Sequence, residues 1–77
     1  MTKEDFKILF GKKLQELRTQ QGLSYRLLAE RCDIDSSDIS KIEKGKVNIQ
    51  LNTILELSVG LSIHPKELFN FELNIEE

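Results

Sequence analysis

Side chains able to form hydrogen bonds and ion pairs gather between residues 36 and 48. Ser36, Ser37 and Ser40 carry hydroxyls that donate or accept, and Lys41 lies one helical turn beyond Ser37. Two more cations and an amide follow, in Lys44, Lys46 and Asn48. Such groups suit the recognition of hydrogen-bonding edges and phosphates. Each residue taken singly has a commoner role, because Ser often caps a helix start and Lys is usually solvated.

The rest of the chain gives little support to catalysis. It holds one His and one Cys, and it lacks a Gly-rich phosphate loop, a CxxC pair and any cluster with metal-ligand spacing. We interpret Cys32 as a core thiol, since free cysteines are among the most buried residues. His64, directly before Pro65, fits a cap or a surface residue better than a ligand or a base. The sequence therefore predicts no enzyme, no cofactor and no metal site.

Two short helices joined by a tight turn position the serines and Lys41. The first begins at a good N-cap, Ser24, and the second is expected to be capped by Asp35 and closed by Gly45, which tolerates positive φ. The apolar stripe of the first helix is Leu27, Leu28 and Cys32. The inner face of the second helix holds Ile39 and Ile42. This is the outline of a helix-turn-helix, which presents its second helix outward with Ser36 and Ser37 at the exposed end.

Helical periodicity continues on both sides of this pair. The long first segment repeats apolar residues on one face and ends at Gly22, the expected left-handed residue, while Asn48 and Pro65 are expected to start later helices. The expected helices span about 3–21, 24–32, 36–44, 50–61 and 65–70. We therefore predict one compact all-α domain of five helices over residues 1–70, followed by a tail at 71–77.

The end of the chain follows a period of two. Apolar residues alternate there with Asn and Glu, at Phe69, Phe71, Leu73 and Ile75. One interpretation is a short β-strand that pairs with its counterpart across a two-fold axis, because a lone strand is unstable in water. The other is a frayed acidic tail whose phenylalanines cap the core. In the first case, the expected homodimer interface comprises Leu61, Ile63, Phe69, Phe71, Leu73 and Ile75.

The charge is polarised along the chain although its net value is only −2. Residues 1–46 hold ten Lys or Arg against eight Asp or Glu, whereas residues 47–77 hold one Lys against five Glu. A mildly basic first part with an acidic far side is compatible with nucleic acid, although the surplus is small. The opening residues MTKEDFK contain no long apolar run, so we expect neither a signal peptide nor a membrane span, and a cytoplasmic protein.

The residues of the two-helix unit resemble those of the lambda-repressor/Cro-type helix-turn-helix family, often called the Xre family. The resemblance covers about Phe6 to Phe69. Within the two-helix unit it is carried by Arg18, Gly22-Leu23-Ser24, Leu28-Ala29, Ile39-Ser40, Ile42-Glu43 and Gly45. Toward the end of the domain it is carried by Leu61, Ile63, Pro65, Glu67, Leu68 and Phe69. Three positions depart from the family pattern, with Tyr25 in place of Gln, Asp33 in place of Gly and His64 in place of Ser.

This resemblance implies a five-helix domain that dimerises on an operator in double-stranded DNA. The helix at 36–44 would then lie in the major groove. The positions that match base-reading residues are Ser36, Ser37 and Lys41, with Ser40 nearby. The positions expected at the DNA backbone are Ser24, Tyr25, Lys44, Lys46 and Asn48. The resemblance also implies a salt bridge between Arg18 and Glu43 beneath this surface.

Two functions remain open from the sequence. The first is a small transcriptional regulator that acts as a homodimer on a roughly palindromic operator, as a phage-type repressor, a restriction–modification controller or an antitoxin subunit. The second is a protein-interaction module on the same fold that docks a partner protein such as a toxin. The second is favoured by Asp35 and Asp38, two negative charges that would repel phosphate near the groove.

Overall fold

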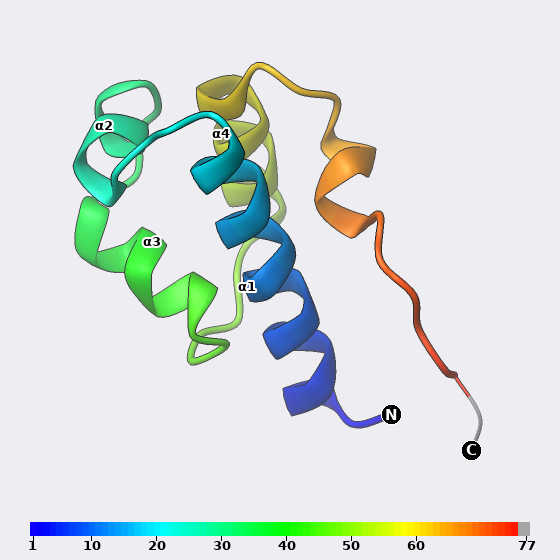
Figure 1. The fold of residues 1–77 in the computed structure, drawn as a ribbon. Coiled ribbons are helices and arrows are strands. Elements are labelled where there is room, and N and C mark those ends of the chain that lie inside the picture. Colours follow the sequence, from blue (N-terminus) through cyan, green and yellow to red (C-terminus); the bar gives the residue numbers. More distant parts are fainter. Residues whose placement is uncertain (76–77) are drawn as a thin grey trace.

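The structure, a computed structural model, describes residues 1–75 and contains four α-helices followed by one 3-10 helix. In chain order they are α1 (Lys3–Gln20), α2 (Tyr25–Glu30), α3 (Ser36–Glu43), α4 (Leu51–Leu61) and the 3-10 helix η1 (Pro65–Phe69) (Figure 1). The all-α prediction is confirmed. The fifth helix, expected at 65–70, is instead a 3-10 turn, as is common for a segment of this length.

The tail does not form a strand. Residues 70–75 have no regular secondary structure, and residues 76–77 lie outside the described part of the chain. The expected β-strand is therefore absent from the described residues of the single chain. Phe71 instead packs its ring against Phe6, with centroids 6.0 Å apart. This contact matches the other interpretation, in which the tail's phenylalanines cap the core.

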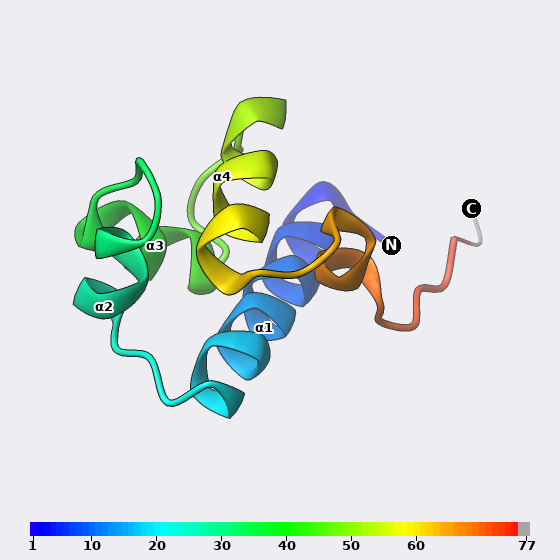
Figure 2. The ribbon, with the colours of Figure 1, turned by 90° about the horizontal axis from the view of Figure 1, so that it is seen from above.

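The helices enclose one core of leucine, isoleucine and phenylalanine side chains. Its buried members are Phe10, Leu14, Leu23, Leu28, Ile39, Ile42, Leu57, Leu61 and Leu68. Helix α1 packs against α3 and η1, while α2 packs against α3 and α4 (Figure 2). The stripe expected in α2 is only partly correct, because Leu28 is buried whereas Leu27 is exposed and Cys32 is half-buried. Burial nevertheless raises the pKa of the Cys32 thiol.

Local conformations agree with the sequence at the helix ends that glycine or serine controls. Gly22 and Gly45 both have φ of 70°, and the Ser24 side chain accepts a hydrogen bond from the Leu27 N–H at 3.1 Å. The His64 side chain accepts one from the Lys66 N–H, also at 3.1 Å. These residues end or cap helices as expected, because they satisfy backbone groups that the helix leaves free.

Three local expectations were wrong. Asp35 occupies the N-cap position of α3 without a side-chain cap bond, and α4 is preceded by Gln50 rather than by a capping Asn48. The expected left-handed turn at Asp33 is not present, since Ser62 is the non-glycine residue with positive φ among the described residues. The Asp33 N–H instead donates to Glu56 Oε1 of α4 at 2.9 Å. A side-chain partner from another helix therefore stabilises this turn without a left-handed residue.

Within residues 1–75, no helix is both long enough and apolar enough to cross a membrane.

Candidate nucleic-acid interface

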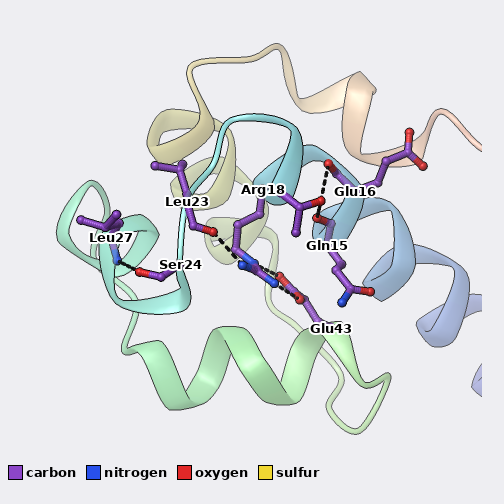
Figure 3. Close-up of polar contacts among 8 residues, drawn as sticks. Gln15, Glu16, Arg18, Leu23, Ser24, Leu27 and Glu43 are labelled. Atoms are coloured by element: carbon purple, nitrogen blue, oxygen red, sulfur yellow. Dashed lines mark hydrogen bonds and ion pairs between the residues drawn. The ribbon is translucent and has the colours of Figure 1, made fainter.

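A buried ion pair joins the end of α1 to the end of α3. The Arg18 guanidinium donates from Nε to Glu43 Oε2 at 2.6 Å and from Nη2 to Glu43 Oε1 at 3.0 Å (Figure 3). Each residue is only 8% exposed. The bonds to Glu43 raise the pKa of Arg18 above its usual value, so the guanidinium stays charged. The salt bridge predicted between these residues is confirmed.

The same guanidinium also fixes the start of α2. Its Nη1 donates to the Leu23 carbonyl oxygen at 2.7 Å, and its Cζ lies 4.3 Å from the centre of the Tyr25 ring. The planar fork of arginine therefore contacts three segments that are distant in sequence. This network holds the first turn of α2 and the last turn of α3 in a fixed relation.

Helix α3 has a buried face and a face turned to solvent. Ile39, Ile42 and Glu43 lie inside, whereas Ser36, Ser37 and Lys41 are exposed and Ser40 is half-buried. Residues one and four apart lie on adjoining parts of a helix surface, so the four outward residues form one patch. The structure thus brings together the expected base-reading residues on the outer face of α3.

The residues expected at the DNA backbone flank this patch. Lys44, Lys46 and Asn48 are exposed in and just before the loop between α3 and α4, and Ser24 is exposed at the start of α2. Tyr25 differs, because its ring is half-buried beneath Arg18. Its exposed surface is therefore limited, and its ring contributes to the network below the patch.

Acidic side chains occupy the opposite end of α3 from the lysines. Asp33, Asp35 and Asp38 line a hollow beside the first turn, whose apolar wall includes Ile34 and Ile42. Carboxylates at a helix N-terminus and cations at its C-terminus both complement the helix dipole. Toward a polyanion the same arrangement is unequal, since phosphate is repelled at the Asp end and attracted at the Lys end.

Sequence reasoning missed two cations beside the loop. Lys3 and Lys7 of α1 line a small hollow together with Phe6 and Asn48. We had placed Lys7 only on the outer face of its helix, away from any site. The periodicity of α1 shows which residues face outward, but it does not show which loop packs beside them. Only the tertiary structure therefore reveals the neighbourhood of Lys3, Lys7 and Asn48.

The residues expected at a dimer interface are not equally available in the single chain. Leu61 is 1% exposed and belongs to the core, so it offers no surface to a partner. Phe69 packs against Phe10 with ring centroids 5.2 Å apart, and Ile63 and Phe71 are half-buried. Leu73 and Ile75 are exposed in the tail. An interface built from this set would rest mainly on the exposed tail residues.

Within residues 1–75 no three His, Cys, Asp or Glu side chains are placed to hold a metal ion. The outward groups are hydroxyls, amides and ammonium groups, which recognise hydrogen-bonding edges and anions.

Comparison with known proteins places most of the chain in one family. A family model described as helix-turn-helix matches residues 14–68. The control protein C.BamHI of Bacillus amyloliquefaciens is 35% identical over 68 residues, covering 87% of this chain and 84% of that protein. The control protein C.MunI of a Mycoplasma species is 42% identical over 67 residues, covering 86% and 90%.

A solved structure supports the same placement. The restriction-modification controller protein C.AhdI from Aeromonas hydrophila superposes with a TM-score of 0.82 at 42% identity, covering 84% of this chain and 98% of that one. The chain therefore shares both the fold and nearly the whole length of this controller protein.

Proposed function

Because the chain belongs to the helix-turn-helix family, we propose that it is a regulator of transcription that binds double-stranded DNA sequence-specifically, as a homodimer on a roughly palindromic operator. The observation that carries this proposal is the outer face of α3. It presents Ser36, Ser37, Ser40 and Lys41 together, on a helix whose far end is fixed by the pair between Arg18 and Glu43. An exposed helix with hydrogen-bonding side chains and a rigid base suits insertion into a major groove.

In this proposal the residues divide into two roles. Ser36, Ser37, Ser40 and Lys41 read base edges, with Lys41 able to reach guanine or a phosphate. The backbone is held by Ser24, Tyr25, Lys44, Lys46 and Asn48. We add Lys3 and Lys7, whose shared hollow with Asn48 extends the cationic surface from the loop onto α1. Residues 1–70 form the DNA-binding domain and residues 71–77 its tail.

Among the settings that the sequence leaves open, we propose that of a restriction–modification controller. C.BamHI, C.MunI and C.AhdI are control or controller proteins by name, and each is matched over at least 84% of its length. A likeness that includes nearly the whole of these proteins supports a shared role better than one confined to a single domain. The likeness to the regulator PuuR of Escherichia coli, for example, covers only 32% of that protein.

Selection of bound duplexes from a random library tests the proposal directly. We expect the native chain to enrich an inverted repeat with half-sites roughly 34 Å apart. Ser37→Ala and Lys41→Ala should relax or lose that repeat. Lys66→Ala is the matched control, because Lys66 is equally exposed but lies in η1, on the other side of α1 from α3 (Figure 1). No enrichment by the folded protein would overturn the proposal.

A protein-interaction module is the second candidate, favoured by the three Asp side chains around the start of α3 and by the net charge of −2. Salt separates the two functions. Phosphate contacts release counterions, so the logarithm of the DNA association constant should fall by about 0.9 per contacted phosphate for each tenfold rise in salt. Binding to a protein partner with little salt dependence, and no affinity for duplex DNA, would favour the module.

A further inference from the structure

Helix α4 carries an apolar face that no described part of the chain covers. Its inner residues, including Leu57 and Leu61, pack toward α2 and η1. On its outer side Leu51, Leu55 and Val59 are 81%, 55% and 57% exposed. They lie four residues apart and so form a continuous line along the helix, the outer α4 stripe. Figure 2 shows α4 projecting from the body formed by α1, α2 and α3.

The outer side of α4 also lacks charge. The exposed residues of the helix are Leu51, Asn52, Leu55 and Val59. The one charged residue of the helix, Glu56, is half-buried and accepts the Asp33 N–H. In a chain with 31% charged residues, an exposed helix face without any is unusual and calls for a partner. Nucleic acid and strongly charged protein surfaces do not match it, because they need opposite charge.

We propose that the outer α4 stripe is the surface through which two copies of this chain pair, with the two α4 helices antiparallel across a two-fold axis at Leu55. A two-fold contact must be self-complementary. The stripe meets this condition, because Leu55 is its centre and its ends are both aliphatic. Leu55 then faces Leu55 of the second copy, and Leu51 faces Val59 of the second copy.

This inference rests on the proposed function and gives it a geometry. The loop that follows α3 leads directly into α4, and α4 packs against α2. Pairing through α4 therefore fixes the separation and direction of the two α3 helices, as an inverted repeat requires. The stripe is short compared with the roughly 800 Å² per partner of a stable complex, so pairing should depend on concentration.

The expected contacts can be tested by cross-linking. In a Cys32→Ser background, mild oxidation should link two copies of Leu55→Cys, since their side chains meet at the axis. Leu51→Cys alone should not link, because its two copies lie on opposite sides of the axis, whereas a mixture of Leu51→Cys and Val59→Cys should. Leu27→Cys, on the exposed side of α2, is the control for random collisions. Linking of Leu55→Cys no faster than this control would overturn the proposed pairing.

Charge substitution gives a second test. Leu55→Glu and Leu55→Lys each place like charges against one another, so sedimentation should show a dimer dissociation constant raised about tenfold or more. Mixing the two variants should restore pairing, which a simple folding defect would not do. Native-like pairing of Leu55→Glu, with pairing lost in Ile75→Glu, would overturn the α4 interface in favour of the tail.

The outcomes separate this inference from the proposed function. An intact dimer that depends on Leu55 but enriches no duplex would overturn DNA regulation and leave the interface standing. A dimer on an inverted repeat that ignores Leu55 would overturn the interface and leave DNA regulation standing. A native chain that is strictly monomeric at high micromolar concentration and on DNA would overturn the interface together with the homodimer.

Discussion

Arg18 shows how one side chain can position a whole surface. Its guanidinium donates to Glu43 of α3 and to the Leu23 carbonyl before α2, and it lies over the Tyr25 ring. No residue of this network lies among the proposed base readers. The network instead stabilises the relation between the elements that carry them. Loss of Arg18 should therefore affect folding first and DNA binding through it.

Removal of Arg18 should be strongly destabilising. Arg18→Ala leaves the 8%-exposed Glu43 carboxylate without a counter-charge, which costs about 3–5 kcal/mol of unfolding free energy. Arg31→Ala is the control, since Arg31 is exposed, and its loss should stay within about 0.5 kcal/mol. Urea or thermal unfolding of both variants measures the difference. Equal small losses would show that the pair contributes little to the fold.

At the scale of the elements, α1 begins with a reciprocal cap that the sequence analysis overlooked. The Thr2 hydroxyl accepts from the Asp5 N–H at 3.0 Å, and Asp5 Oδ2 accepts from the Thr2 N–H at 3.1 Å. The bond from the Thr2 backbone lowers the pKa of Asp5, with a smaller effect of the Thr2 side chain. A capping box of this kind satisfies two backbone donors at once.

The lowered pKa makes the first turn of α1 sensitive to acid. Because the folded pKa of Asp5 lies below its unfolded value, the cap contributes fully above the ordinary Asp range and is lost as the pH falls through the folded pKa. Amide exchange at the first turn should therefore accelerate in acid. Asp5→Asn should remove most of this pH dependence while the last turn of α1 stays unchanged. Identical pH profiles for both proteins would contradict the cap.

Close packing of α1 on α3 depends on a second overlooked residue, Gly11. A Cβ atom there would lie 2.4 Å from the Glu43 carbonyl oxygen and 2.6 Å from that of Ile42. Both are backbone atoms at the end of α3, so they cannot move aside as a flexible side chain would. The two helices approach closely because this position of α1 has no side chain.

Gly11→Ala should accordingly separate α1 from α3 and cost about 3 kcal/mol or more. Gly22→Ala is the matched control. Gly22 has positive φ but no atom within 4 Å of the added Cβ, so its loss should be limited to about 1–2 kcal/mol of backbone strain. Denaturant unfolding measures both. A smaller loss for Gly11→Ala than for Gly22→Ala would show that the helices adjust at little cost.

Periodicity and capping rules thus reach as far as the elements themselves. They placed the helices, the left-handed Gly22 and Gly45, and the outward serines of α3, because these features depend on nearby residues. They failed where a distant partner decides the structure. Asp33 is held by Glu56, Gly11 is required by the approach of α3, and Lys7 adjoins Asn48 only in the folded chain. The 3-10 form of η1 was missed because a helix of this length has no distinguishing period.

For the molecule as a whole, charge and apolar surface lie in different places. Cations flank the outer face of α3 and the loop after it, while the outer α4 stripe is uncharged. A small net charge is therefore compatible with DNA binding, since local potential rather than the total governs the encounter. The same separation allows one surface to bind DNA while another binds a second copy.

Pairing through α4 should make the stability of the native chain depend on its concentration. A dimer of folded chains stabilises the folded state by mass action, so the Tm should rise by roughly 5 °C over a hundredfold range above the dissociation constant. Leu55→Glu should abolish this rise, whereas Leu27→Glu, an equally apolar exposed position on α2, should retain it. Scanning calorimetry across concentration measures all three proteins. A Tm of the native chain that does not change with concentration would mean that its stability comes from the monomer core, with the outer α4 stripe contributing none.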